Sequence, residues 1–322
     1  MEKRRKVIID CDPGIDDSLA LLLALKSKEL EVVGITIVCG NVPIKEGGEN
    51  ALKTLEILKA LHIPVYLGEE KPLKRQLVTA QDTHGEDGLG ECYFEKIEGA
   101  EVKEGAVDFI IDTIKKEKVS IIALGPLTNI AKAIEKNKKV FENLEEFVSM
   151  GGAFRIHGNC SPVAEFNYWV DPHGADYVFQ NLGHKIHMIP LDVTRKIVLT
   201  PNILEGIRRL NNPIGEYIVK ITKFYVDFHW KQEGIIGCVI NDPLAVAYFI
   251  DKSLCTGFSS YVEVVKEGVA VGQTIVDKED FWRKSHNSLV LNEVNSKEFM
   301  YRFLETVFKE NHETLRKLKE VI

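Results

Sequence analysis

The sequence lacks the features of several large protein classes. Its 322 residues contain no run of 18 apolar side chains, so we expect no membrane-spanning helix. Basic residues are not in excess, and the net charge of −7 argues against a nucleic-acid partner. The six cysteines form no Cys-x-x-Cys pair, which predicts free thiols. The first residues show no signal-peptide pattern, so the expected location is the cytoplasm.

The first 190 residues alternate between two patterns. Short apolar runs predict strands, and the amphipathic runs between them predict helices. This alternation predicts an α/β fold, in which a mostly parallel, Rossmann-like open sheet carries helices on both faces. The expected strands are Lys6–Asp10, Glu31–Cys39, Val65–Gly68, Val119–Leu124, Phe147–Met150 and Lys185–Leu191. The expected helices are Asp16–Lys28, Pro43–His62, Gly105–Lys118, Pro126–Lys136 and Pro172–Leu182.

The C-terminal portion is predicted to be more helical. The expected helices are Pro201–Leu210, Pro213–Lys231, Pro243–Ile250 and one long terminal helix, Ser296–Lys319. Ser260–Val265 and Ala270–Val276 predict the two strands of a hairpin. No repeat, low-complexity tract or linker interrupts the chain, so residues 1–322 are expected to form a single domain. Gly68–Gly105 is the longest stretch without predicted structure, and such long loops are often functional lids.

Four carboxylates follow the first predicted strand within eight residues: Asp10, Asp12, Asp16 and Asp17. Ligands in an open α/β sheet bind outside the carboxyl ends of the strands. Four anions at one place repel each other unless a cation neutralises them, and carboxylate oxygens suit Ca²⁺ or Mg²⁺. Helix capping is an alternative for Asp16 or Asp17, but it leaves Asp10 and Asp12 unexplained. We therefore predict a divalent-metal site at this strand end.

Other predicted strands also end in glycines and polar residues. These ends are Val38-Cys39-Gly40-Asn41, Leu124-Gly125-Pro126-Leu127-Thr128-Asn129 and Ser149-Met150-Gly151-Gly152. Each alone is typical of a turn, but together on one sheet edge they predict a cleft. Glu165 and Asn167 lie two residues apart in a polar loop, on one side of an extended chain, where they suit a polyol such as a sugar. Asp242 opens a later helix, either as its N-cap or turned toward the metal.

These segments together resemble the nucleoside hydrolase family, of the inosine–uridine-preferring type. The resemblance rests on DCDPGIDD at 10–17, Gly40-Asn41, LGPLTNIA at 124–131, MGGA at 150–153, GNCSPVAEFN at 158–167 and Asn-Asp-Pro at 241–243. It extends in order from residue 6 to about residue 250. It implies an α/β enzyme that binds Ca²⁺ and cleaves the N-glycosidic bond of ribonucleosides to give ribose and free base.

The resemblance also implies roles for the matching residues. The metal ligands would be Asp12, Asp17, the backbone carbonyl of Thr128, and Asp242. The substrate would be bound by Asp16, Asn41, His84, Met150, Asn159, Glu165, Asn167 and Asn241, with His84 near the ribose 5′-hydroxyl. Asp10 would support the metal loop from behind. Relatives form dimers and tetramers, so a homo-oligomer is expected.

The chemistry expected of such a site begins with water. A Ca²⁺-bound water is easier to deprotonate than bulk water, and Asp12 could take its proton as general base. Attack at the anomeric carbon then builds positive charge on the ribose ring, as in other glycosyl transfers. A metal that grips the 2′- and 3′-hydroxyls would favour ribose over 2′-deoxyribose.

One residue departs from the family pattern. Many members of this type carry His at the position of Asn241, where it is thought to protonate the departing purine. An Asn amide cannot deliver a proton at neutral pH. We predict that His229, twelve residues earlier, replaces it as acid or base contact, with Tyr225, Trp230 and Gln232 as neighbours. The alternative is a histidine that simply packs in its helix.

Two other functions fit parts of the sequence. A haloacid-dehalogenase-like phosphatase also has Asp-x-Asp after its first strand, but Pro13-Gly14 occupies the place of the hydroxyl residue that this class requires. A non-catalytic nucleoside or ribose sensor would keep the metal and the sugar contacts. Asn241 favours the sensor, and the intact Asp12 argues against it.

Overall fold

The computed structural model describes residues 4–309 and 312–320. Within these residues a ten-stranded sheet has the order β11-β10-β12-β7-β6-β5-β1-β2-β3-β4. Its strands are β1 (Arg5–Cys11), β2 (Leu30–Ile37), β3 (Val65–Leu67), β4 (Lys103–Glu104), β5 (Ser120–Ala123), β6 (Phe147–Met150), β7 (Ile186–Ile189), β10 (Cys255–Val264), β11 (Thr274–Asp277) and β12 (Ser288–Val294). Neighbours from β12 to β4 are parallel, and β10 and β11 extend the β12 edge in antiparallel fashion. The predicted α/β class with a mostly parallel sheet is confirmed.

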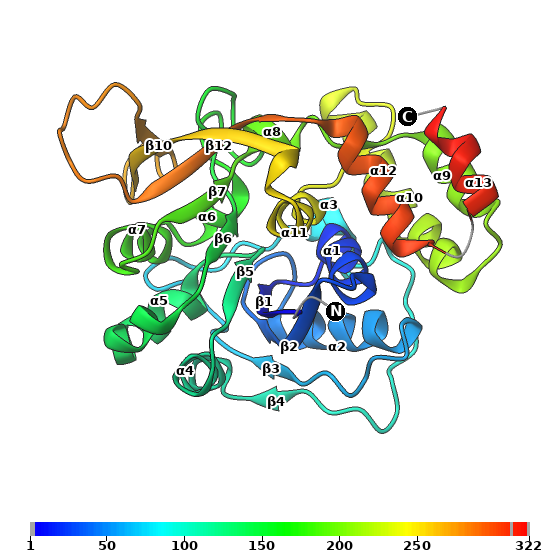
Figure 1. Cartoon of the computed structure of the whole chain (residues 1–322), viewed down its shortest axis with the longest axis horizontal. Helices are drawn as coiled ribbons and strands as arrows, with labels where there is room; N and C mark the ends of the chain where they lie inside the picture. Colours follow the sequence, from blue (N-terminus) through cyan, green and yellow to red (C-terminus); the bar gives the residue numbers. More distant parts are fainter. Residues whose placement is uncertain (1–3, 310–311, 321–322) are drawn as a thin grey trace.

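Helices cover both faces of this sheet (Figure 1). The α-helices are α1 (Ile15–Lys26), α2 (Ile44–Ile57), α3 (Gln81–His84), α4 (Ala106–Lys116), α5 (Thr128–Asn137), α6 (Phe166–Val170), α7 (Pro172–Asn181), α8 (Leu191–Thr194), α9 (Pro201–Arg208), α10 (Pro213–Glu233), α11 (Asp242–Ile250), α12 (Ser296–Val307) and α13 (His312–Lys319). Two 3-10 helices, η1 (Lys138–Asn143) and η2 (Lys252–Leu254), and a small antiparallel pair, β8 (Val198–Leu199) and β9 (Cys238–Val239), complete the described elements.

The buried side chains form two clusters, one on each face of the sheet. In β1, Val7 and Ile9 belong to the cluster under α1, α2, α11 and α12, whereas Ile8 belongs to the cluster under α4, α5 and α7. This alternation follows from the two-residue period of a strand. Because both faces are covered, the inner strands are apolar throughout, as their sequences predict.

Three features of the C-terminal portion differ from the sequence prediction. β12 was not expected, since its sequence SLVLNEV mixes apolar with polar residues. β10 begins at Cys255, five residues before the expected start of the hairpin strand. The expected terminal helix is two helices, because α12 ends at Val307 and the buried Phe308 has non-helical backbone angles.

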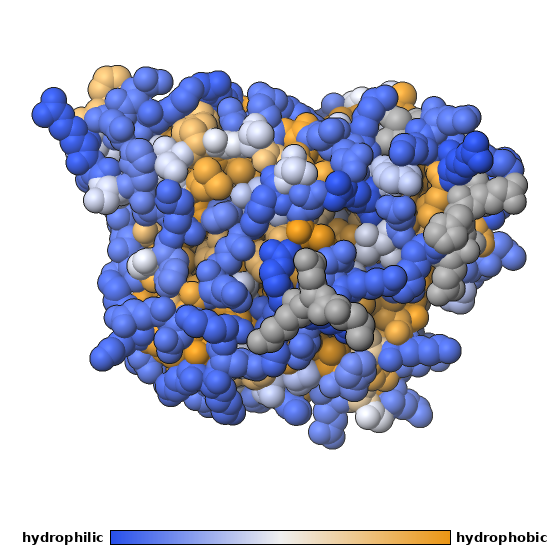
Figure 2. Space-filling view, viewed as in Figure 1, coloured by the Kyte–Doolittle hydropathy of each residue, from blue (hydrophilic) through white to orange (hydrophobic). Residues whose placement is uncertain are grey.

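The surface is predominantly polar on the face drawn in Figure 2, with scattered apolar side chains between charged ones. Among the described residues, none of the helices is both long enough and apolar enough to cross a membrane. All six cysteines are free thiols, as predicted. The stretch 68–105 contains only α3 and β4 as regular elements, which agrees with the predicted long loop.

Candidate active site

The topology places β1 at the switch point of the sheet. From β1 the chain runs outward through β2, β3 and β4, and then crosses to the other side of β1, where β5, β6 and β7 follow. Ligands in open α/β sheets bind at such a point, outside the carboxyl ends of the strands. A cavity of about 530 Å³ opens there, a size typical of a small-molecule site.

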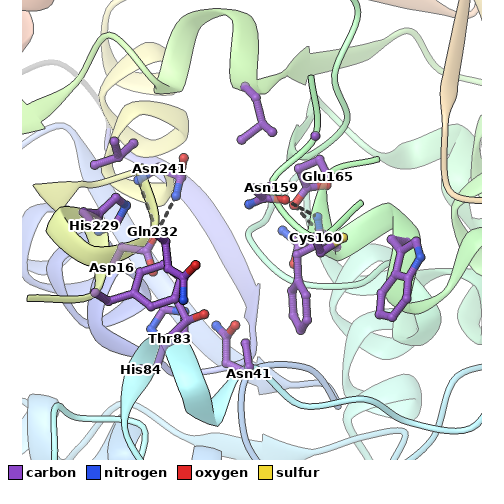
Figure 3. Close-up of a pocket in the computed structure, with 18 of the residues that line it drawn as sticks. Asp16, Asn41, Thr83, His84, Asn159, Cys160, Glu165, His229, Gln232 and Asn241 are labelled. Atoms are coloured by element: carbon purple, nitrogen blue, oxygen red, sulfur yellow. Dashed lines mark hydrogen bonds between the residues drawn. The ribbon is translucent and has the colours of Figure 1, made fainter. Parts of the chain in front are cut away.

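Most of the residues predicted to bind substrate line this cavity. Figure 3 shows two facing sides, with Asp16, His229 and Asn241 on one and Asn159 and Glu165 on the other. The predicted residues in the lining are Asp16, Asn41, His84, Met150, Asn159, Glu165, Asn167, His229, Asn241 and Asp242. The predicted metal ligands Asp12, Asp17 and Thr128 and the predicted supporting residue Asp10 are buried.

The carboxylate of Asp12 is held between two backbone segments. A Cβ atom at Gly40 would lie 1.9 Å from Asp12 Oδ2, and one at Gly125 would lie 2.5 Å from Oδ1, so only glycine permits this close approach. The backbone N–H of Asn41 donates to Oδ2 at 2.8 Å. Oδ1 is buried and has no hydrogen-bond partner among the described residues. The structure therefore fixes one oxygen and leaves the other open to a ligand.

Asp17 organises the loop between β1 and α1. Its Oδ1 accepts from the backbone N–H of Asp12 at 3.2 Å, and its Oδ2 accepts from the N–H of Gly14 at 3.0 Å. Asn41 Nδ2 also donates to Asp17 Oδ2, at 3.1 Å. Burial raises the pKa of Asp17 to about 7, with a further contribution from the neighbouring Asp16.

The buried carboxylates form a group with the chemistry of a metal site. One oxygen each of Asp16, Asp17 and Asp242 lies within 4.8 Å of the others. Burial, and then repulsion by the neighbouring carboxylates, raises the pKa of Asp12 and Asp242 well above the ordinary value. Such a group suits a hard divalent cation, because a cation removes the repulsion between the carboxylates. Asp12 is not one of the three residues whose oxygens are grouped. The grouping includes Asp16, which the sequence analysis assigned to the substrate.

Asp10 is fully buried near the end of β1, two residues before Asp12. Its Oδ1 accepts from Thr36 Oγ1 at 2.5 Å and from Asn129 Nδ2 at 2.8 Å. Asn129 Nδ2 also donates to the backbone carbonyl of Ile37, which ties α5 to β2 across β1. Burial raises the pKa of Asp10 to about 7. Sequence reasoning missed Thr36, since nothing in a β-branched strand residue indicates a carboxylate partner.

The side of the cavity that faces Asp16 is built around Glu165, at the N-terminus of α6. Its carboxylate accepts from the backbone N–H groups of Gly152, Asn167 and Tyr168 at 2.8, 2.7 and 3.2 Å. Burial nevertheless raises its pKa to about 7. Asn167 Nδ2 donates to the carbonyl of Leu124 at 2.7 Å, which locks this side to the end of β5.

The opposite side carries two histidines around Tyr225. The His84 and Tyr225 ring centroids are 5.2 Å apart, and those of Tyr225 and His229 are 4.5 Å apart. His84 Nδ1 accepts from the backbone N–H of Ile15 at 3.1 Å. Burial lowers the pKa of both histidines, so both are predominantly neutral at pH 7.

Asn241 contacts Asp16. Its backbone N–H and its Nδ2 donate to Asp16 Oδ2 at 3.2 and 3.1 Å, and Tyr225 Oη donates to the same oxygen at 3.5 Å. Asn241 Oδ1 is buried without a hydrogen-bond partner among the described residues. Asn241 therefore orients a carboxylate of the acidic group.

The structure corrects one predicted neighbour and adds residues. Trp230 is 58% exposed and is not among the described residues that line the cavity, whereas Tyr225 and Gln232 are. Asp171 accepts from Thr128 Oγ1 at 2.7 Å, a contact that joins α7 to the predicted metal ligand. The ion pair of Arg195 with Glu233, at 3.0 Å, also lines the cavity. The sequence indicates Asp171 as a helix N-cap, because it precedes Pro172. Its contact with Thr128 could not be predicted, because the two residues lie far apart in the chain.

Comparison with known proteins identifies close relatives. The pyrimidine-specific ribonucleoside hydrolase RihA of Salmonella typhimurium is 35% identical over 298 residues, 91% of this chain and 95% of its own. Uridine nucleosidase 1 of Arabidopsis thaliana is 35% identical over 279 residues, 86% of this chain and 83% of its own. The structure of a purine-preferring ribonucleoside hydrolase from Gardnerella vaginalis matches with a TM-score of 0.90 and 33% identity, covering 95% of this chain and 99% of that one.

The fold and the acidic site define a metal-dependent α/β enzyme that acts on a small polar substrate. Residues 7–301 match the inosine-uridine preferring nucleoside hydrolase family, and the chain belongs to that family of N-glycosidic bond hydrolases. The resemblance drawn from the sequence motifs is thereby confirmed. A haloacid-dehalogenase-like phosphatase is excluded.

Proposed function

We propose that this protein hydrolyses ribonucleosides to ribose and free base with Ca²⁺ as its resident metal. The observation that carries the proposal is a buried acidic group at the floor of a sugar-sized cavity, with Asp12 Oδ1 lacking any other partner among the described residues. The all-oxygen donor set suits Ca²⁺ better than a soft metal. Asp12, Asp17, Asp242 and the backbone carbonyl of Thr128 would hold the ion, with Asp16 beside them.

Asp12 is the general base of the proposed reaction. When bound, the ion would lower the pKa of a coordinated water. The Asn41 N–H and the backbone at Gly40 and Gly125 fix the Asp12 carboxylate, so that it can take a proton from the attacking water without reorganising. The Asp12 side chain therefore does not need to move between substrate binding and proton transfer.

The sugar is held from the opposite side. Glu165 and Asn167, anchored by backbone contacts, would bind ribose hydroxyls together with Asn159, Met150 and Asn41 in the cavity lining. Fixed carboxylates at this position stabilise positive charge as it develops on the ribose ring. We expect 2′-deoxyribonucleosides to react more slowly, because they lack a hydroxyl that the site would bind.

His229 is proposed to activate the leaving base in place of the usual histidine. Its Nδ1 lies 2.8 Å from the carbonyl of Tyr225, which can only accept, so Nδ1 carries a proton and Nε2 is the atom that gains or loses one. Asn241 has no acidic proton and is engaged with Asp16. His84, on the same side, would contact the 5′-hydroxyl.

The relatives named above include both a pyrimidine-specific and a purine-preferring enzyme, so the base must be determined by assay. We infer a homo-oligomer, a dimer or tetramer, which light scattering after size exclusion would measure. Free cysteines suit the reducing cytoplasm.

A chromatographic assay for free base tests the proposed function. Purified protein loaded with Ca²⁺ is incubated separately with inosine, adenosine, guanosine, uridine and cytidine. We expect base release from at least one of them, and a loss of roughly 100-fold or more in kcat for Asp12→Asn. Release of no base by folded, metal-loaded protein, with nucleoside binding in calorimetry, would instead support the sensor.

A further inference from the structure

The segment that carries His84 is held at one end by the loop after β2 and at the other by the first residue of α1. The backbone N–H of Ala80 donates to the carbonyl of Asn41 at 3.0 Å. At the other end of α3, the N–H of Ile15 donates to His84 Nδ1. Figure 3 shows the ribbon of Thr83 and His84 running beside Asp16 and Asn41. The position of this segment therefore decides where His84 stands in the cavity.

Beyond His84 the chain folds into a compact turn around Asp87. The Asp87 carboxylate accepts from the backbone N–H groups of Leu89, Glu91 and Tyr93 at 2.9, 2.8 and 2.7 Å. Gly88 adopts φ +73°, and a Cβ there would lie 2.9 Å from Asn50 Nδ2. The turn is thus pressed directly onto α2.

Asn50 of α2 connects this turn to the acidic loop. Its side chain is completely buried, and its Nδ2 donates to the carbonyl of Pro13 at 3.1 Å and to the carbonyl of Asp87 at 2.8 Å. Pro13 directly follows Asp12, and Asp87 lies three residues after His84. A single amide therefore bridges the backbone of the proposed metal loop and that of the His84 segment.

The orientation of the Asn50 amide is fixed by a buried lysine. Lys53 Nζ lies 3.2 Å from Asn50 Oδ1, and an ammonium group can only donate. The amide oxygen must therefore face Lys53, and both N–H groups face the two carbonyls. Without this amide, two buried carbonyl groups would lose a donor, which is costly.

We propose that Asn50 is a positioning residue for His84. It holds residues 80–93 against the loop between β1 and α1. The side of the cavity that carries His84 is therefore formed before substrate binds. The inference rests on the proposed function for its kinetic consequence, but the structural link is independent of it. No part of Asn50 lines the cavity, so it acts only through the groups it positions.

The test compares Asn50→Leu with Asn287→Leu. Asn287 offers a matched control, since its Nδ2 also bridges two backbone carbonyls, those of Phe179 and Val262, far from the cavity lining. Hydrogen exchange by mass spectrometry should show residues 80–93 exchanging roughly tenfold faster or more in Asn50→Leu. Asn287→Leu should leave this segment unchanged. If Asn50→Leu does not fold, Asn50→Asp, which keeps the size and removes both donors, replaces it.

A double-mutant cycle with His84→Ala separates positioning from general destabilisation. Asn50→Leu should lower kcat/KM by about tenfold in the wild-type background and have little effect in the His84→Ala background. An equal loss in both backgrounds, or unchanged exchange of residues 80–93, overturns the proposal. If the wild-type protein releases no base, the proposed function fails, and the exchange measurement alone decides the role of Asn50.

Discussion

At the residue scale, the two cavity histidines have opposite hydrogen-bonding roles. His84 Nδ1 accepts from a backbone N–H, so its neutral form carries the proton on Nε2 and donates from there. His229 Nδ1 donates to a carbonyl, so its neutral form has a free Nε2 lone pair. His84 is therefore suited to donate a hydrogen bond from Nε2 to a hydroxyl oxygen. His229 can take up a proton at Nε2 and, once protonated, deliver it to the leaving base.

His229→Ala should lower kcat by roughly 100-fold, the usual contribution of a general acid. Burial lowers the pKa of His229 below 6.5, so its protonated fraction decreases as pH rises through that lowered value. At saturating Ca²⁺, which keeps the metal-binding carboxylates ionised, kcat of the wild-type protein should decrease over the same range. This limb of the kcat–pH profile should be absent in His229→Ala, as measured by base release between pH 4.5 and 8.

A substrate with a good leaving group provides the control for His229. The nitrophenolate group of a nitrophenyl riboside can leave as a stable anion, without being protonated. His229→Ala should therefore hydrolyse this substrate almost as fast as the wild-type protein does. His187→Ala, a partly buried histidine outside the cavity lining, should leave nucleoside turnover unchanged. An equal loss on nucleoside and nitrophenyl riboside would mean that His229 supports the fold or the sugar, not the leaving base.

Contacts between residues close in the sequence could be predicted, whereas contacts between distant segments could not. Tyr225 and His229 are four residues apart on α10 and share a face, whereas Trp230 is turned by about 100° and faces solvent. Helical geometry could therefore have corrected the prediction for Trp230. The contacts of Asp10 with Thr36 and of Asp171 with Thr128 join distant segments, and no local pattern indicates them.

At the element scale, the β10–β11 hairpin supports the side of the cavity that carries Glu165. Gln273, next to β11, forms a β-bridge with Ala164, the residue before Glu165. Gly272 packs beside Trp169 of α6, where a Cβ would lie 2.6 Å from the Trp169 Cα. The antiparallel addition to the sheet therefore reaches the loop that carries Asn159 and Glu165.

Gly272→Ala should raise KM by roughly tenfold or more, since a small displacement of positioned groups has large effects. The added methyl group would displace Trp169, which lines the cavity, and with it the loop that carries Glu165. Gly268→Ala is a closely matched control, because both glycines have φ +82° and Gly268 has no other atoms within 4 Å of the added carbon. Steady-state kinetics on the best nucleoside would measure both variants.

The two variants share the backbone strain of a left-handed residue, of order 1 kcal/mol. Thermal unfolding should therefore show a decrease for both, with the larger one for Gly272→Ala. Only Gly272→Ala should show a raised KM. A similar KM for both variants would show that the hairpin does not support the sugar-binding loop.

Elements with a clear period were predictable, and elements defined by partners were not. The strands from β1 to β7 are short apolar runs between amphipathic helices, except β4, whose two residues Lys103 and Glu104 are exposed. The sequence of β12 mixes apolar and polar residues and does not by itself predict a strand. It forms one because it pairs with both β7 and β10. α12 ends where the buried Phe308 leaves helical backbone angles, and no periodic pattern in the sequence indicates this break.

At the scale of the whole molecule, the acidic site conflicts with the stability of the fold. The β1 loop and α11 place Asp12, Asp16, Asp17 and Asp242 close together in the interior. Protons or a cation must neutralise this charge. The metal-free protein should therefore be more stable at low pH than its surface charges alone would imply, and the metal should stabilise it most where protons are absent.

The gain in thermal stability on adding Ca²⁺ should therefore increase with pH. Asp10, Asp17 and Glu165 have folded-state pKa values of about 7, raised by burial above ordinary values near 4. Between about pH 4 and pH 7 the folded protein holds protons that the unfolded chain has released, so the stability of the metal-free protein falls as pH rises through this range. Ca²⁺ at 100 times its dissociation constant should add about 2.7 kcal/mol, or roughly 5 °C in Tm, at pH 7.5.

The measurement is the difference in Tm between Ca²⁺-loaded and chelator-treated protein at pH 5 and pH 7.5. Taking the difference at each pH cancels the contribution of surface carboxylates, which are the same with and without metal. The difference should be smaller at pH 5, because protons then compete with the cation for the same oxygens. In Asp17→Asn the charge to be neutralised is smaller and a ligand is lost, so both the Ca²⁺ gain and its pH dependence should shrink. A Ca²⁺ gain that is larger at pH 5, or absent at pH 7.5, would contradict a cation site made of these buried carboxylates.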